Sequence, residues 1–389
     1  MRSRTSCVTG LFGILALAIV AASASAGCGS DESSPSSASG GAGGSAAPDG
    51  GGAGGSSAGS GGASGSGAGG SGAGSGGAGA TGGAGLGGQA GGAGMAGGGG
   101  LPEGDNGIAA KHPGDVGISG DSAVLFADDF ESYAQASDLW SRWDNVFQMS
   151  ETRIATEAEN LYAGKQALEF KLPQQTDELS NAVDKVVAPE RDVLFLRYYS
   201  KFEPPFDVVG SSHNGSMISA HYYVNGQATP GVKADGTNKF LANLENWRGE
   251  ATTASPGQLN IYIYHPEQRD VWGDHFFPTG LVMPNTSLPY DFGPDFVSRP
   301  DVIPELGKWY CYEYMVKANT PGLRDGRIAI WLDGKLTADF GNLRLRDVDT
   351  LKIDRFGLSF HVKANPNGET RKWYDNVVAA TAYIGPLKP

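Results

Sequence analysis

Apolar and polar residues alternate with a period of two in many short runs beyond about Ala123, which is the spacing of side chains along a β-strand. β-branched and aromatic residues dominate these runs, and Gly, Pro, Asn and Asp separate them. No long apolar stripe with helical spacing accompanies them. The pattern predicts an all-β domain, a two-sheet sandwich of the jelly-roll type. The clearest runs are 194–199, 216–223, 239–245, 258–264, 309–316, 327–332, 355–362 and 373–380.

The same alternation divides the side chains of each run between the interior and the opposite face. Apolar residues such as Leu259 and Ile261 should point inward. On a curved sheet the opposite face would form a groove for a saccharide, because tyrosine rings offer stacking area and amides offer hydrogen bonds. The alternative is an ordinary solvated sheet face. The expected outward residues are Ser219, His221, Tyr223, Lys239, Asn243, Glu245, Gln258, Asn260, Tyr262, Tyr264, Gly357, Ser359 and His361.

The first 27 residues have the organisation of an export signal. Arg2 and Arg4 precede an apolar stretch at 11–22, which is too short and too close to the start for a comfortable membrane span. Two cleavage sites compete: the small residues at 24–26 suit ordinary signal peptidase, whereas 25–28 (SAGC) resembles a bacterial lipobox, in which Cys28 would be lipidated. We favour the lipobox. We therefore expect an exported bacterial protein, an outer-membrane lipoprotein or an extracellular one, that touches the membrane through its lipid anchor only.

Residues 28–118 form a predicted linker ahead of a folded part at 119–389. Between residues 28 and 100 the chain holds 34 of its 61 glycines and has no aromatic residue, no lysine and no arginine. A tract with so little to bury cannot recover the entropy lost on ordering, so we expect a disordered Gly/Ser/Ala-rich tether. Such a tether would let the folded part search beyond the membrane; tolerated low complexity is the other interpretation.

Charge and cysteine content exclude several classes of protein. A net charge of −13 does not suit a basic nucleic-acid binder, so we expect no nucleic-acid partner. Only the leader approaches the length of an apolar span, which argues against a polytopic membrane protein. Cys311 is the one cysteine beyond residue 28, so there is no disulfide framework, and we expect a buried, inert thiol. The folded part is large enough for a core of its own, and we expect a monomer.

Five segments look familiar when they are taken together. They are 126–132 (FADDFES), 210–213 (GSSH), 310–314 (YCYEY), the hairpin at 325–334 and 373–385 (WYDNVVAATAYIG). They resemble the core domain of the fungal cellulose-induced secreted protein family, which is related to glucuronan lyases with a concanavalin-like or lectin-like jelly roll. The resemblance spans about residues 122–387, and it is loose from 225 to 305, where this chain carries insertions.

The resemblance implies a structural calcium ion between the N-terminal segment, a following turn and the last strand. Glu131 and Asp375 match the family's two carboxylates. Ala163 would offer its backbone carbonyl, and Gln166 stands where the family has an amide side chain. Calcium prefers several oxygen ligands of both kinds, and the ion would join the two ends of the domain. Without it, Glu131 and Asp375 would be surface turn residues.

The resemblance also implies a reaction, β-elimination in a uronic-acid polysaccharide such as glucuronan. A cation or amide must neutralise the carboxylate, a base must take the C5 proton, and an acid must protonate the departing oxygen. His213 is the best match for a groove histidine. Tyr262 and Tyr264 are candidate acids. The candidates for neutralising the carboxylate are Asn243 and Arg248, with Lys239 on the same face as Asn243.

Further groove residues would bind the polysaccharide: His221, Tyr223, Glu245, Asn260 and His361. The fungal domain has a His-x-Arg pair where this chain reads KFL at 239–241, so a non-catalytic carbohydrate-binding lipoprotein remains the alternative. A glycoside hydrolase comes third, because it needs two facing carboxylates and Glu245 is the only acid that we can place on the groove face.

Two of these residues also have a plainer interpretation, and a further pair of histidines is no metal site. His213 could be an ordinary loop histidine. Arg248 could pair with Glu250 at a turn. His265 and His275 are poorly spaced for zinc.

Overall fold

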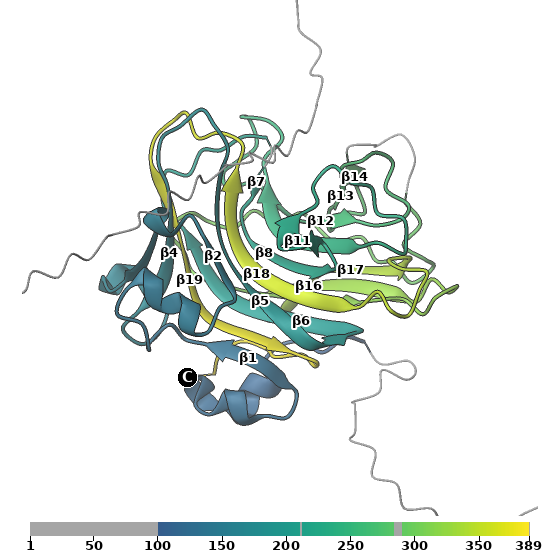
Figure 1. Ribbon diagram of the computed structural model, residues 1–389, viewed down its shortest axis with the longest axis horizontal. Helices are drawn as coiled ribbons and strands as arrows, with labels where there is room; N and C mark the ends of the chain where they lie inside the picture. The colour runs from purple at the N-terminus through teal and green to yellow at the C-terminus, as the bar shows by residue number, and fades with distance from the viewer. Residues whose placement is uncertain (1–99, 211, 284–289, 389) are drawn as a thin grey trace, which may run out of the picture. The chain divides into compact units, whose positions relative to one another are not determined.

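The computed structural model describes residues 100–210, 212–283 and 290–388. Two antiparallel β-sheets pack face to face, and the helices of this part are short 3-10 turns (Figure 1). This confirms the predicted all-β, two-sheet jelly-roll sandwich. The predicted export signal, Cys28 and the glycine-rich tract up to residue 99 lie outside the described residues.

We call the first sheet the support sheet. Its strand order is β17-β16-β15-β6-β19-β4-β3, with β1 beside β19. The bounds of its strands are β1 Val124–Asp128, β3 Thr152–Ala155, β4 Ala167–Leu172, β6 Val193–Phe202, β15 Tyr310–Lys317, β16 Gly326–Leu332, β17 Lys335–Leu343 and β19 Thr370–Ala380.

We call the second sheet the concave sheet, since its strands bend and its hollow side faces away from β6 and β16 (Figure 1). Its order is β14-β13-β12-β11-β8-β18-β5-β2, with β7 beside β18. The bounds are β2 Asn145–Phe147, β5 Leu179–Arg191, β7 Ser212–His213, β8 Ser216–Ala220, β11 Phe240–Trp247, β12 Gln258–Tyr264, β13 Asp274–Phe276, β14 Val282–Met283 and β18 Ile353–Val362.

The remaining elements are small. A two-stranded ribbon is formed by β9 (Tyr223–Val224) and β10 (Gln227–Ala228). The 3-10 turns are η1 Ile108–Lys111, η2 Pro113–Asp115, η3 Ile118–Gly120, η4 Ala136–Ser141, η5 Met149–Glu151 and η6 Ala158–Asn160.

The main hydrophobic core lies between the two sheets and follows the predicted alternation. It contains the inward residues of β11, β12 and β18, which are Phe240, Ala242, Leu244, Leu259, Ile261, Ile263, Phe356, Leu358 and Phe360. Burial of these side chains stabilises the fold by about 1.5–3 kcal/mol each, and it fixes the register because a one-residue slip would turn them to solvent.

The folded domain begins near residue 101, so the expected linker boundary at 118 was wrong. Residues of η1 and η3, namely Ile108, Ala109 and Ile118, are buried against Trp331 and Tyr383 on the outer face of the support sheet. Backbone hydrogen bonds from Ile108 N to Tyr383 O (3.0 Å) and from Ala109 N to Ile384 O (2.8 Å) fix this segment. The sparse apolar residues of 101–118 gave no periodic signal, because they fill gaps in a surface made by distant strands.

One ion pair seals this segment onto the sheet. Arg197 of β6 is fully buried, and its Nη2 donates to Asp115 Oδ2 at 2.5 Å. Arg197 on β6 is paired in register with Glu313 on β15. The Glu313 carboxylate accepts the backbone N–H groups of Ile384 and Gly385. Arg197 therefore lies on the support sheet, far from any groove on the concave sheet.

We expect Asp115→Ala to destabilise the protein strongly, because it leaves the buried Arg197 guanidinium without its counterion. Breaking a buried ion pair in this way costs about 3–5 kcal/mol. Urea unfolding of the full chain, followed by tryptophan fluorescence, would measure the change. The matched control is Asp105→Ala, at an exposed acid of the same segment. Equal urea midpoints for the two variants would show that Asp115 does not hold this segment.

Candidate functional site

The register of the concave sheet aligns six outward positions in one row across the strands. Asp184 of β5 pairs with Gly357 of β18, and Gly357 pairs with Met217 of β8. The row continues through Asn243 of β11 and Tyr262 of β12 to His275 of β13. These six positions are spread over more than 170 residues of the sequence, so only the pairing of strands in the sheet brings them together. We call this row and the outward residues next to it the floor.

Near the middle of the floor, two histidines flank one carboxylate. Nδ1 of His213, on β7, lies 2.7 Å from Glu245 Oε2, and Nδ1 of His275 lies 3.3 Å from Glu245 Oε1. The Tyr262 ring lies against both, with its centroid 4.8 Å from that of His213 and 4.9 Å from that of His275. We call His213, Glu245, Tyr262, His275 and His361 the histidine cluster. The predicted site residues His213, Glu245, Tyr262 and His361 therefore come together.

Glu245 is a buried carboxylate that stays ionised. Burial by itself raises the pKa of Glu245, but the charge and hydrogen bond of His213, followed by those of His275, outweigh it, so the pKa is lowered. The result is a fixed negative charge beneath two imidazole rings. Such a carboxylate orients histidines in the way that the aspartate of a catalytic triad does.

His361 closes the cluster on the β18 side. Its ring stacks on His213 at 5.3 Å, and its Nδ1 lies 2.5 Å from Ser180 Oγ. Burial, with the adjacent His213, lowers the pKa of His361 to about 3, so this ring is neutral at ordinary pH. Its Nε2 is buried and has no hydrogen-bond partner in the described structure.

Tyr262 is a proton donor rather than a base. Burial and the neighbouring Tyr264 raise the pKa of Tyr262 well above its usual value, so the hydroxyl keeps its proton. Its oxygen accepts the backbone N–H of Gly273 at 2.9 Å, which fixes the phenol against the cluster.

The floor carries several buried polar atoms without a hydrogen-bond partner. Leaving such an atom unpaired costs about 1–3 kcal/mol, so a face that collects them is prepared for a polar ligand or for water. Hydroxyl groups of a saccharide would offer both donors and acceptors to them. Among the described residues of this face, the atoms are Asp184 Oδ2, Ser219 Oγ, Asn243 Oδ1, Glu245 Oε1, Arg355 Nε and His361 Nε2.

One end of the floor is covered by an insertion of the chain itself. The outward residues Leu241 and Tyr264 are buried beneath Tyr222 and Ala234, and Trp272 packs against the same cluster. Tyr264 Oη accepts the backbone N–H of Gly231 at 3.2 Å. Tyr264, which we predicted as a candidate acid, is therefore buried under this insertion, and its ring centroid lies 5.7 Å from that of Tyr262.

Lys239 and Arg248, predicted to neutralise a substrate carboxylate, are engaged elsewhere. Lys239 Nζ bonds to Thr229 and lies over the rings of Tyr264 (4.5 Å) and Tyr222 (4.9 Å). Arg248 pairs with Asp207 and donates to the carbonyl oxygens of residues 251 and 253, both at 2.6 Å. Neither the predicted groove position of Arg248 nor its alternative pairing with Glu250 is what the structure has. The inserted loops supply these partners, and the alternation could not reveal them.

Three predicted binding residues have different positions. His221 does not join the cluster, because β8 ends at Ala220 and the left-handed backbone of His221 (φ 51°) turns its ring to Glu190 at 3.1 Å. Tyr223 stays beside the floor, where Arg355 lies over its ring at 4.5 Å. Asn260 supports the cluster, since its Oδ1 lies 3.0 Å from His275 Nδ1.

The sequence did not identify His275 or Trp247 as site residues. His275 lies on a strand of only three residues, which is too short for alternation to be recognised. His265, which we judged poorly spaced to share a zinc ion with it, pairs with Asp274 at 3.0 Å. Trp247 continues the outward series of β11 beyond Glu245, and its ring lies 5.2 Å from that of His275. Extending the alternation by two residues would have found Trp247.

The predicted calcium ligands lie together at one turn. Glu131 Oε1 accepts the N–H groups of Lys165 (2.6 Å) and Gln166 (2.9 Å), and Asp375 Oδ2 accepts those of Tyr162 (3.0 Å) and Ala163 (3.2 Å). Burial, with the charge of Glu131 adding to it, raises the pKa of Asp375 to about 7. The negative charges of the two carboxylates repel each other, so a cation beside them would be favourable. Among the described residues no group of three or more His, Cys, Asp and Glu is arranged to hold a metal, so further ligands would be neutral oxygens.

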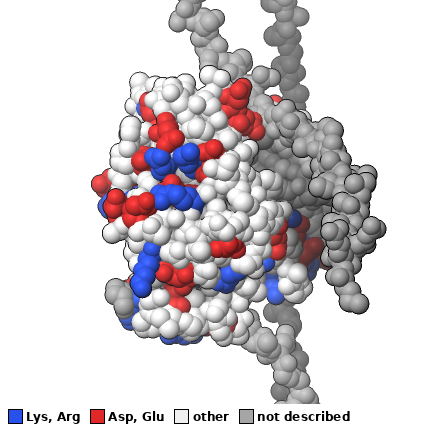
Figure 2. Space-filling view, turned by 60° about the vertical axis from the view of Figure 1, so that its left-hand side comes forward, with Lys and Arg blue, Asp and Glu red and all other residues white. Residues whose placement is uncertain are grey.

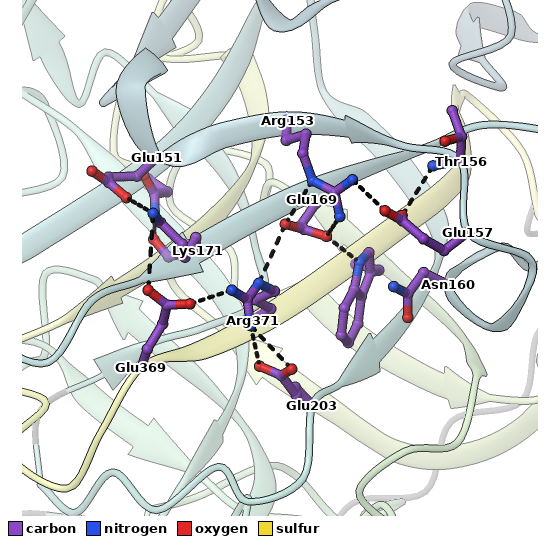
Figure 3. A network of polar contacts seen from close by, with 12 residues as sticks. Glu151, Arg153, Thr156, Glu157, Asn160, Glu169, Lys171, Glu203, Glu369 and Arg371 are labelled. Atoms are coloured by element: carbon purple, nitrogen blue, oxygen red, sulfur yellow. Dashed lines mark hydrogen bonds and ion pairs between the residues drawn. The ribbon is translucent and has the colours of Figure 1, made fainter.

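A second hollow, with a volume of about 800 Å³, lies on the support sheet around β3, β4, β6 and β19. Figure 3 shows its charged groups joined in a network, in which Arg153 contacts Glu157 (2.7 Å) and Glu169 (3.0 Å) and Arg371 contacts Glu203 (3.2 Å). Basic and acidic side chains are likewise interspersed on the face that Figure 2 presents. Because these charges neutralise one another, the histidine cluster is the stronger candidate for a site.

No protein-family model and no curated protein matches this chain. Similar solved structures include a variant of alginate lyase Aly36B in complex with alginate trisaccharide (19% identity, 68% of this chain, 100% of that chain, TM-score 0.49). They also include the endo-beta-1,4-glucuronan lyase from the fungus Trichoderma reesei (17%, 67%, 96%, 0.42) and the cellulose induced protein Cip1 (14%, 67%, 99%, 0.36). One fold hosts many functions, so the chemistry of this chain depends on its own residues.

Proposed function

We propose that this protein is an exported polysaccharide lyase that cleaves a uronic-acid polymer, glucuronan-like in its chemistry, by β-elimination. The observation that carries the proposal is the contact between His213 and Tyr262 on the floor, at 4.8 Å between rings. It supports the proposal because a candidate base then lies beside a candidate acid, on a face where several buried polar atoms have no hydrogen-bond partner.

The reaction assigns a role to each ring. His213 takes the C5 proton, and the electron pair of the C5–H bond forms the new C4=C5 double bond. The C4–O bond breaks, and its electron pair leaves with the oxygen. The departing oxygen takes the proton of Tyr262, whose raised pKa keeps that proton available. Glu245 holds the His213 ring in place through its 2.7 Å contact. The floor supplies Asn243, whose amide can donate to the substrate carboxylate.

A non-catalytic carbohydrate-binding protein is the second candidate, and a specific observation favours it. The cations expected to neutralise a uronate, Lys239 and Arg248, are bound to other parts of the chain. A face with aromatic rings and unpartnered polar atoms can bind a neutral saccharide without them. A glycoside hydrolase is less suitable, since the lowered pKa of Glu245 makes it a poor proton donor.

The export signal, the lipid on Cys28 and the tether remain part of this proposal. A lipidated Cys28 would attach the domain to a bacterial outer membrane, and the tether would let it reach polymer beyond the surface. The described residues include no helix that is long and apolar enough to span a membrane. We also propose that the protein acts as a monomer.

We propose that Glu131 and Asp375 hold a structural calcium ion, with the Ala163 carbonyl and the Gln166 side-chain oxygen as neutral ligands. The ion would supply no chemistry to the reaction. It would neutralise two carboxylates that lie between the N-terminal segment and the last strand, and so join the ends of the domain.

The lyase proposal predicts that the purified full chain generates an unsaturated product, visible by ultraviolet absorbance, from glucuronan or alginate but not from neutral glucans. His213→Gln should lower this rate by about 10²–10⁴-fold, because the base is lost while a polar group still faces Glu245. The control is His112→Gln, at a histidine that pairs with Asp121 in the N-terminal segment.

Absence of product from every uronate, combined with retention of the chain on a polysaccharide affinity gel, would support the binding protein instead. A wild-type rate in His213→Gln would remove His213 from the site.

The calcium proposal predicts that adding calcium to metal-free protein raises its Tm at pH 8. At 100 times Kd the gain is about 2.7 kcal/mol, or roughly 5 °C or more for a domain of this size. Asp375→Asn should abolish the gain, whereas Asp177→Asn, at an exposed acid, should keep it.

The same carboxyl predicts a pH dependence in metal-free buffer. The folded pKa of Asp375 is about 7, above the usual value of about 3.9 in an unfolded chain. The folded state therefore holds a proton that the unfolded state releases, and the contribution of Asp375 to stability falls as the pH rises from about 4 to about 7. Calcium should reduce this fall. A Tm unaffected by calcium at pH 8 would contradict the proposal.

A further inference from the structure

Two histidines share one buried carboxylate on the floor, and they do so through the same ring atom. Nδ1 of His213 faces Glu245 Oε2 at 2.7 Å. Nδ1 of His275 faces Asn260 Oδ1 at 3.0 Å and Glu245 Oε1 at 3.3 Å. The Glu245 side chain has no solvent exposure, so its charge must be compensated from within the cluster.

These contacts fix the tautomer of both rings. The neighbours of each Nδ1 are acceptors, and the orientation of Asn260 is set because its Nδ2 donates to Gln258 O at 3.1 Å. Both Nδ1 atoms therefore carry hydrogen, and both Nε2 atoms point away from Glu245. The side chains of His213 and His275 remain 19% and 16% exposed, so a ligand on the floor can reach them.

The groups around the two rings carry one negative charge between them. Glu245 contributes one negative charge from β11, which compensates one imidazolium. Tyr262 of β12 is a neutral phenol, and His361 of β18, stacked on His213, is neutral because burial lowers its pKa. A proton on each of His213 and His275 would leave an excess positive charge in a largely buried cluster.

We infer that His275 is a further catalytic residue, the group that neutralises the substrate carboxylate when it carries the proton of the pair. This inference rests on the proposed lyase function, and it fills the role that Lys239 and Arg248 cannot take. His213 then stays neutral and acts as the base, and Tyr262 lies against both rings and acts as the acid. Glu245 is the positioning residue for the two histidines.

Each proton that moves in the reaction is exchanged between the cluster and the substrate. The C5 proton moves to Nε2 of His213, and the departing oxygen takes the proton of Tyr262. His275 remains protonated while the carboxylate is converted to the unsaturated acid. A proton then returns from His213 to the Tyr262 oxygen, whose ring lies against it, and the starting state is restored.

The test compares one uronate polymer in its free-acid form and its methyl-esterified form. On the free acid, His275→Gln should lower kcat/KM by about 10²–10³-fold, the usual effect of removing one electrostatic group. On the methyl ester, which has no carboxylate charge, the same variant should lose less than about tenfold. His112→Gln should leave both rates unchanged. Equal losses on the two forms would overturn the assignment of His275.

A second measurement does not depend on activity. Nitrogen NMR of the imidazoles in the full chain should show hydrogen on Nδ1 of both His213 and His275. On addition of a uronate oligosaccharide, Nε2 of His275 should carry hydrogen as well. A His275 Nε2 without hydrogen in that complex would overturn the inference. A doubly protonated His275 in a chain that cleaves no uronate would leave His275 as the carboxylate-binding group and reject the lyase function, so the two failures are distinguishable.

Discussion

The packing of the two sheets is the constraint on which the rest of the structure depends. Each strand of the concave sheet must bury one set of side chains against the support sheet, as Phe240, Ala242 and Leu244 do in β11. With a side-chain period of two, every intervening residue is turned to the opposite face. The polar side chains of these strands therefore gather on that face, and the register decides which of them meet. Glu245 meets His275 because Tyr262 pairs with both β11 and β13.

Charge in this protein is balanced locally, although the chain as a whole carries −13. Arg197 is matched by Asp115, Glu245 by two histidines, and Lys239 by two aromatic rings and Thr229. A buried charge without such a partner would cost several kcal/mol. The same balance explains why the mixed charges around Arg153 and Arg371 make a structural network.

The first and last segments of the domain are attached to the support sheet. The segment at 101–118 covers the outer face of the support sheet, and the backbone around Ile384 meets both this segment and Glu313. Glu131 and Asp375 form a second junction between the start and the end of the domain. Together they clamp β1 and β19, the strands through which the first and last parts of the domain pair.

The sequence by itself determined the all-β class, the two-sheet sandwich and the outward faces of β11, β12 and β18, because strand alternation is a local property. It also singled out His213, Tyr262, Glu245 and His361, which can be recognised from strand alternation or from a short motif. Only the tertiary structure decided which of these touch, that Lys239 and Arg248 are sequestered by inserted loops, and that His275 completes the cluster. Those outcomes depend on contacts between residues far apart in the chain. The true start of the domain also depends on such distant contacts. Residues 101–118 have no periodicity of their own and become ordered only by filling the surface around Trp331.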